Sequence, residues 1–193
     1  QYENKKVLSV ASTMIFTSMS VLLYTQADLW ILGLFTSTEE VGIYGVAARL
    51  VTLILFPMMA FSAIIPPIMS SLHTSAKYDE LRRVVSESTR WILSMAIPII
   101  IIMVLEGKII LKYAYGDKFI DGYTALVILS IGLLIKAGSG MVGVLLQMTG
   151  EHKTFMKVTI LGGLSNIFLN LLLVPHFGMI GAAFGIGFVI GPA

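Results

Sequence analysis

The chain has 193 residues, of which 56% are hydrophobic and only 12% are charged, and its mean hydropathy is +0.90. A soluble globular domain carries about a quarter of charged residues, so these values exclude that class and indicate an integral membrane protein. The net charge of +2 is too small to indicate a nucleic-acid partner, and the absence of cysteine excludes disulfides, thiolate metal ligands and thiol catalysis.

Six apolar segments follow one another along the chain. Lipid requires each of them to be a helix, because the backbone finds no other hydrogen-bond partners there. We expect spans at 7–35, 41–71, 91–112, 123–148, 154–174 and 179–193, the last one incomplete. The predicted fold is therefore an all-α membrane protein, a bundle of six transmembrane helices that occupies residues 1–193 as one domain. We expect this domain to be a piece of a longer protein.

Lysine and arginine are distributed unequally between the two sides of the predicted bundle. Lys5, Lys6, Lys77, Arg82, Arg83, Arg90, Lys153 and Lys157 fall on one side, and Lys108, Lys112 and Lys118 fall on the other. By the positive-inside rule, the N-terminal end lies in the cytoplasm. The longest cytoplasmic connection, 73–90, is then either an amphipathic helix on the inner leaflet or a solvated connector.

Proline and glycine mark two structural features of the spans. Pro57 and Pro98 lie inside helices, where the missing N–H and the clash with the preceding turn predict kinks. Gly181 and Gly185 are four residues apart in the last span, and small residues at this spacing predict close helix packing in lipid.

Three charged residues lie deep inside the spans, where each costs about 2.5–3.5 kcal/mol near the helix centre and is expected to pair or to face water. Asp28 precedes the polar turn 36–40 by eight residues and Arg49 follows it by nine, so both should lie about 12 Å below the turn. Lys136 lies near the middle of the span 123–148. An ion pair between Asp28 and Arg49 would leave Lys136 free for an anionic substrate. Alternatively, the three charges form a structural network.

Uncharged polar residues recur at steps of three or four within the spans, which places them on one helix face. The further candidates for lining an internal cavity are Thr52, Gln147, Asn166 and Asn170. Such residues either bind a substrate or join neighbouring helices, and both interpretations stay open. No nucleophile with its base and no metal-ligand spacing is found, so we expect no catalytic residue, no metal site and no cofactor.

Several short motifs occur in a particular order across nearly the whole chain. They are Asp28-Leu-Trp-Ile-Leu-Gly33, Val41-Gly-Ile-Tyr44 with Ala47 and Arg49-Leu50, Tyr115-Gly116 with Phe119, Gly150-Glu-His-Lys153, Asn166 with Asn170, and Pro175-His-Phe-Gly178 leading to Gly181-Ala-Ala183. In this order they resemble the second half of the polysaccharide and O-antigen flippases of the multidrug/oligosaccharidyl-lipid/polysaccharide exporter superfamily.

The resemblance implies the C-terminal one of two six-helix bundles, which form a V around a cavity and open alternately to either side. Such flippases move a polyprenyl-pyrophosphate-linked oligosaccharide across the cytoplasmic membrane for surface polysaccharide synthesis, and cationic cavity residues engage the pyrophosphate. Arg49 and Lys136 fit that role here. The implied partners are lipid-linked oligosaccharide, membrane lipid and the N-terminal six-helix half of the same protein.

Three other functions have different sequence requirements. A multidrug exporter for cationic substrates favours buried acids, whereas this chain has one deeply placed acid and two deeply placed bases. An exporter of the peptidoglycan precursor would also need cations and stays open. A membrane-embedded glycan polymerase or ligase carries a long external loop with catalytic arginine or histidine, and the longest external connection here runs only over 106–122. We therefore expect a transporter rather than an enzyme.

Overall fold

The computed structural model describes residues 15, 18–19, 26–139 and 141–188, with the side chains of residues 187 and 188 left out. Every regular element in this part of the chain is a helix. In chain order they are Gln26–Phe35, α2 (Thr38–Val51), the 3-10 helix η1 (Thr52–Leu55), α3 (Phe56–Thr74), α4 (Tyr78–Tyr115), the 3-10 helix η2 (Asp117–Gly122), α5 (Tyr123–Ser139), α6 (Val142–Met148) and α7 (His152–Phe188).

Four helical stretches within the described residues are long and apolar enough to cross a membrane: Thr38–Thr74, Tyr78–Tyr115, Asp117–Ser139 and His152–Ile186. The chain is therefore an all-α, multi-pass membrane protein. Most of the predicted span 7–35 lies outside the described residues, apart from its outer end Gln26–Phe35. The count of six spans consequently stays a prediction.

The second predicted span is helical throughout, but its geometry changes just before Pro57. Pro57 has no N–H to donate to the carbonyl of Leu53, four residues earlier, and its ring crowds that carbonyl. The N–H of Phe56 donates to the Leu53 oxygen instead, which tightens residues 52–55 into the 3-10 turn η1 between α2 and α3. The helical geometry thus changes just before Pro57, whereas α4 is helical on both sides of Pro98, and the kinks predicted at the two prolines stay predictions.

Helix α4 is much longer than the predicted span 91–112, because the connection before it is also helical. Its 38 residues extend about 57 Å, against about 30 Å of hydrocarbon. Trp91 is 59% exposed and Tyr113 is 84% exposed, and aromatic side chains of this kind favour the two membrane interfaces. They stand about 33 Å apart along the helix, so we expect residues 78–90 to lie beyond an interface at Trp91. The prediction of a separate surface helix in this connection is wrong, because the helix runs unbroken into the span.

Labelling with a membrane-impermeant maleimide should show this projection, since the chain contains no cysteine of its own. Tyr78→Cys, placed in a full-length protein without other cysteines, should react readily because residue 78 lies in water beyond the interface. A helix lying flat on the leaflet would bury this apolar position and protect it. Ile101→Cys is the matched control: Ile101 is also exposed on α4, but it lies in the apolar stretch between Trp91 and Tyr113 and should not react.

The fourth predicted span is not one helix. Helix α5 ends at Ser139 and α6 begins at Val142, next to the glycine-rich segment 138–140. The Ser139 hydroxyl donates to the carbonyl oxygen of Lys136 at 2.6 Å, which satisfies one of the last backbone acceptors of α5. Lys136 consequently lies in the last turn of α5, and the predicted span 123–148 is interrupted just after it. Its depth in the membrane stays a prediction.

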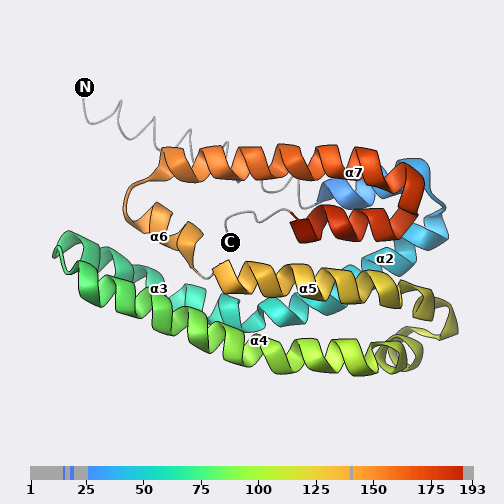
Figure 1. Cartoon of the computed structure of the whole chain (residues 1–193), viewed down its shortest axis with the longest axis horizontal. Helices are drawn as coiled ribbons and strands as arrows, with labels where there is room; N and C mark the ends of the chain where they lie inside the picture. The colour runs from blue at the N-terminus through green and yellow to red at the C-terminus, as the bar shows by residue number, and fades with distance from the viewer. Residues whose placement is uncertain (1–14, 16–17, 20–25, 140, 189–193) are drawn as a thin grey trace.

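The fifth and sixth predicted spans are two arms of α7 that fold back on each other (Figure 1). The backbone at Gly178 is non-helical, with φ 54° and ψ −133°, a conformation that favours glycine. Just after it, the N–H of Met179 donates to Glu40 Oε1 at 2.8 Å, so the Glu40 carboxylate caps the start of the return arm. The α7 turn is thus attached to the first turn of α2.

The two arms of α7 approach each other closely where the sequence places small residues. A Cβ atom on Gly181 would lie 2.5 Å from the carbonyl oxygen of Leu173, and one on Gly185 would lie 2.7 Å from Asn170 Oδ1. The predicted packing role of Gly181 and Gly185 is confirmed. Side chains larger than hydrogen at these positions would force the arms apart.

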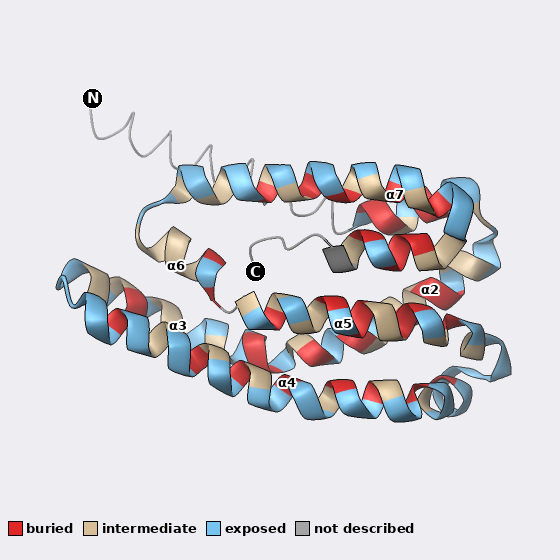
Figure 2. Cartoon of the chain, viewed as in Figure 1, coloured by how far each residue is buried: buried red, intermediate tan, exposed pale blue. Residues whose placement is uncertain are grey.

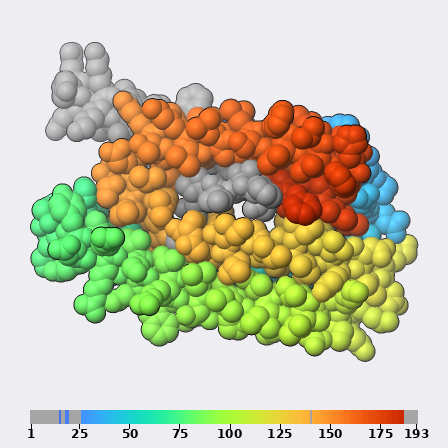
Figure 3. All heavy atoms as spheres, viewed as in Figure 1, coloured from blue at the N-terminus to red at the C-terminus, as the bar shows by residue number. Residues whose placement is uncertain are grey.

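The helices form two opposing sides with α5 between them. Helix α4 packs against α3 and α5, and α5 also packs against α2 and α7. Figure 2 shows buried positions along the side of α4 that faces its neighbours and exposed positions along its outer side. In the space-filling view, α7 forms one long edge of the molecule and α4 forms the opposite edge (Figure 3).

Candidate functional site

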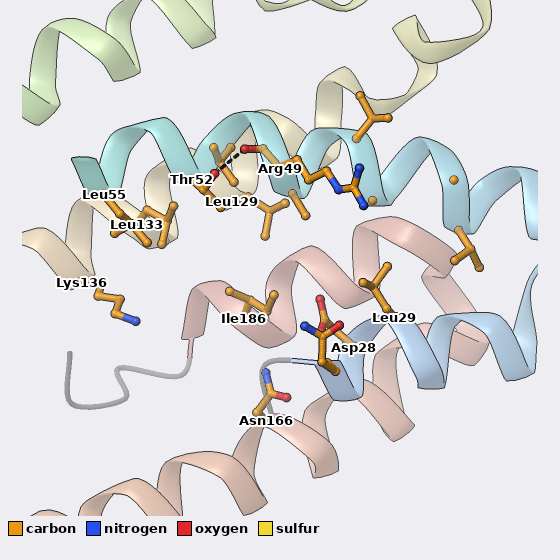
Figure 4. Close-up of a pocket in the computed structure, with 18 residues that line it drawn as sticks. Asp28, Leu29, Arg49, Thr52, Leu55, Leu129, Leu133, Lys136, Asn166 and Ile186 are labelled. Atoms are coloured by element: carbon orange, nitrogen blue, oxygen red, sulfur yellow. Dashed lines mark hydrogen bonds between the residues drawn. The ribbon is translucent and has the colours of Figure 1, made fainter. Parts of the chain in front are cut away.

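A cavity of about 710 Å³ lies between the helix Gln26–Phe35, α2, η1, α5 and α7. Five of the seven predicted site residues line it: Asp28, Arg49, Thr52, Lys136 and Asn166. They come from segments that are far apart in sequence, and Figure 4 shows Arg49 and Thr52 on α2 and η1 across the cavity from Asp28 and Asn166. The fold therefore gathers these polar groups around one space.

Asp28 is buried and is bound by a residue that the sequence analysis did not place in the site. Tyr44 Oη donates a hydrogen bond to Asp28 Oδ2 at 2.8 Å, and Tyr44 itself is fully buried. The other carboxylate oxygen, Oδ1, has no hydrogen-bond partner among the described residues. An ion pair between Asp28 and Arg49, one of the two arrangements that the sequence left open, is not formed among the described residues, where the hydrogen-bond partner of the carboxylate is Tyr44.

Arg49 and Thr52 continue a small and polar face of α2 that also includes Gly42 and Gly45. These residues are three or four positions apart, as expected for one side of a helix. The Thr52 hydroxyl donates to the carbonyl oxygen of Arg49 at 2.6 Å, drawn as the dashed line in Figure 4. The Thr52 hydroxyl hydrogen is therefore engaged within the helix, and the hydroxyl oxygen can act only as an acceptor toward the cavity.

Lys136 brings a second cation to the cavity from α5, a helix that packs against both α2 and α7. The ion pairs within the described residues are Lys77–Glu80, Arg83–Glu87, Lys112–Asp117 and Lys118–Glu39, and none of them includes Arg49 or Lys136. The end of a helix favours a cation, since its last carbonyl groups carry partial negative charge. The cavity thus holds two cations without an acidic partner in the described part of the chain, together with one acid.

The two asparagines of α7 have different positions. Asn166 is buried and lines the cavity, whereas Asn170 is buried one turn further along and does not line it. Asn170 Nδ2 donates to Asn166 Oδ1 at 3.1 Å, and the Asn170 carbonyl group lies against Gly185. Asn170 therefore supports Asn166 and the packing of the α7 arms.

Gln147, the last predicted site residue, lies on α6 and does not line the cavity. Its side-chain amide is 3.5 Å from the carbonyl oxygen of Gly143 on the same helix. The break between α5 and α6 separates Gln147 from Lys136, with which it was expected to share a helix face.

Most of the remaining wall is apolar, with residues such as Leu29, Val46, Leu55, Leu129, Leu133 and Ile186. An apolar wall strengthens the electrostatic interactions of charges that are shielded from water. Asp28 is buried and Lys136 is half-buried, whereas Arg49 is exposed. The arrangement suits an anionic group held by separate cations next to polar acceptors. It offers no nucleophile with a base in hydrogen-bond reach, and no cluster of three or more histidine, cysteine or acidic residues is found in the described part of the chain.

Comparison with known proteins identifies the protein family. The family model described as MatE matches residues 13–172. The chain belongs to the MatE family. This assignment confirms the resemblance to the exporter superfamily that the sequence motifs indicated.

The curated relatives of this chain come from Haloferax volcanii and Methanocaldococcus jannaschii. The chain is 33% identical over 163 residues to the probable flippase AglR of Haloferax volcanii, and 23% identical over 169 residues to the probable low-salt glycan biosynthesis flippase Agl15 of the same organism. It is 26% identical over 150 residues to an uncharacterized membrane protein of Methanocaldococcus jannaschii. These matches cover 83%, 88% and 77% of this chain, but only 34%, 36% and 30% of the respective relatives. The chain thus spans about a third of the length of these MatE relatives, and no solved structure matches it.

Proposed function

We propose that this chain is the C-terminal six-helix half of a flippase that moves a polyprenyl-pyrophosphate-linked oligosaccharide across the cytoplasmic membrane for surface polysaccharide synthesis. The observation that carries the proposal is the cavity, which holds Arg49 and Lys136 without acidic partners among the described residues. Two charge-assisted contacts would offset the loss of water around a diphosphate. The names of the two Haloferax relatives support the same class of transporter.

The rest of the proposal concerns the parts that complete the transporter. An N-terminal bundle of the same protein closes the cavity from the other side, and the two bundles alternate between inward and outward openings. The prenyl chain stays in lipid between the bundles, while Thr52 and Asn166 offer hydrogen bonds to sugar hydroxyls. The N-terminal end of this chain lies in the cytoplasm, in accordance with the positive-inside rule. No bond is broken in this process, so the protein is a transporter and needs no cofactor.

The test is translocation by the purified full-length protein in vesicles. We expect it to move a fluorescent lipid-linked oligosaccharide between leaflets faster than empty vesicles do, and to leave a lipophilic cationic dye untransported. Dye efflux without movement of the lipid-linked sugar would favour a multidrug exporter. Movement of a peptidoglycan-precursor lipid in preference to other glycolipids would favour that alternative substrate of the same superfamily.

A further inference from the structure

One polar side chain of the cavity wall has its acceptor engaged by a neighbour that lies outside the cavity. Asn166 is 2% exposed and lines the cavity, and Figure 4 shows its side chain pointing from α7 into that space. The Asn166 carbonyl oxygen Oδ1 accepts a hydrogen bond from Asn170 Nδ2 at 3.1 Å. The amide group of Asn166 still has two N–H groups to donate, and neither donates to another of the described residues.

Asn170 is in turn enclosed by the return arm of α7. Its side chain is fully buried and does not line the cavity. A Cβ atom on Gly185 would lie 2.7 Å from Asn170 Oδ1 and 2.9 Å from Asn170 Nδ2. The Asn170 amide therefore occupies space that exists because residue 185 is glycine. The return arm thus supports the residue that engages Asn166.

The direction of this hydrogen bond decides what Asn166 can offer to a ligand. Because Oδ1 faces Asn170, the amide presents donors to the cavity, as the cations Arg49 and Lys136 also do. Phosphate oxygens and sugar oxygens are acceptors that such groups complement. The reversed amide would present a carbonyl oxygen, which has no proton to share with a phosphate oxygen.

We propose that Asn166 donates a hydrogen bond to an acceptor oxygen of the head group, either of a phosphate or of the first sugar, and that Asn170 is the positioning residue that keeps the Asn166 N–H groups turned toward the cavity. This inference rests on the proposed function. It gives the return arm of α7 a part in substrate recognition, through a residue that the substrate does not touch.

The test measures binding of a short-chain fluorescent polyprenyl diphosphate, with and without one attached sugar, to the full-length protein in lipid nanodiscs. Asn166→Leu keeps the branched shape of the side chain without its donors, and should weaken binding about three- to tenfold, as expected for one lost hydrogen bond. Loss with both probes assigns the donor to a phosphate oxygen, and loss with the glycosylated probe alone assigns it to the sugar. Thr159→Val is the matched control: Thr159 is buried on the same arm but does not line the cavity, so both affinities should stay unchanged.

The positioning role of Asn170 is tested by a double-mutant cycle. Asn170→Leu should weaken probe binding roughly fivefold, because the Asn166 amide can then turn its carbonyl oxygen toward the cavity. In an Asn166→Leu background the same substitution should change affinity less than about twofold, since no amide is left to orient. An equal loss in both backgrounds would show that Asn170 acts on the structure in general, and would overturn its positioning role.

Two glycines of the return arm test the same contact from the other side. A methyl group at Gly185 would press on the Asn170 amide, whereas one at Gly181 would press on the backbone carbonyl of Leu173. Gly185→Ala and Gly181→Ala should both lower the unfolding midpoint, but only Gly185→Ala should have a smaller effect on binding when Asn166→Leu is present. Equal dependence of the two variants on Asn166 would overturn the link to the return arm. If Gly185→Ala does not fold, the Asn170→Leu cycle decides.

The remaining outcomes separate this inference from the proposed function. Unchanged binding of both probes by Asn166→Leu, while Arg49→Ala and Lys136→Ala lose binding, would overturn the donor role and leave the proposed function intact. Failure of the unmodified protein to bind either probe would instead count against the proposed function itself.

Discussion

Replacing Lys136 or Arg49 with alanine should reduce translocation of lipid-linked oligosaccharide by the full-length protein at least about tenfold, without reducing the amount of protein in the membrane. Each cation lines the cavity and pairs with no acid in the described part of the chain. A hydrogen bond to a charged group contributes about 1.5–3 kcal/mol, which corresponds to roughly a 10- to 150-fold change in affinity. The measurement is export of lipid-linked glycan in cells, or leaflet exchange in vesicles, at matched abundance.

Two controls keep the positive charge at residues 136 and 49, and a third removes a cation outside the cavity. Lys136→Arg and Arg49→Lys should retain more transport than the alanine variants, although their different geometries make full activity unexpected. Lys118→Ala removes a cation from an exposed ion pair with Glu39, away from the cavity, and should leave transport unchanged. Normal export by both alanine variants would show that the cations serve structure alone, and the proposed function would then rest on the relatives.

Gly178→Ala should destabilise the protein by roughly 2–4 kcal/mol. Residue 178 has φ 54°, where a side chain costs about 1–2 kcal/mol. The new methyl group would also collide with the Glu40 carboxylate and displace it from the Met179 N–H, a cap worth about 0.5–2 kcal/mol. The measurement is the thermal unfolding midpoint of the full-length protein in detergent.

Gly150→Ala provides a matched control for this prediction. Gly150 also has a positive φ, 82°, but a Cβ atom there would meet nothing within 4 Å. Gly150→Ala should therefore lower the unfolding midpoint only through the cost of a side chain at positive φ. Glu40→Gln should show part of the capping loss without any change in backbone strain. Equal midpoints for Gly178→Ala and Gly150→Ala would mean that the contact between α7 and α2 contributes nothing to stability.

The sequence predicted those features that depend on local chemistry. Hydropathy identified the apolar spans, the glycine spacing identified the close contact of the α7 arms, and the missing N–H of Pro57 identified the irregular turn. Counting residues from the turn 36–40 correctly placed Asp28 and Arg49 near each other, because both helices rise by the same distance per residue. Both residues line one cavity.

Features that depend on rotation about a helix axis, or on competition between partners, could not be predicted in this way. Opposite charges suggested an ion pair for Asp28, but Tyr44 occupies the carboxylate, and a tyrosine in an apolar helix gives no signal of its own. The break after Ser139 was missed because hydropathy continues unchanged across it, and it moved Gln147 away from the cavity. Glycine at 138 and 140 was the available signal for that break.

The contact between Glu40 and Met179 also has a consequence for the order of assembly. It joins residues 139 positions apart, so the return arm of α7 acquires its cap only after the first helices have been inserted and retained in place. Contacts of such long range form late in folding, since the intervening chain must first be ordered. Until residue 179 has been synthesised, the Glu40 carboxylate lacks this hydrogen-bond partner.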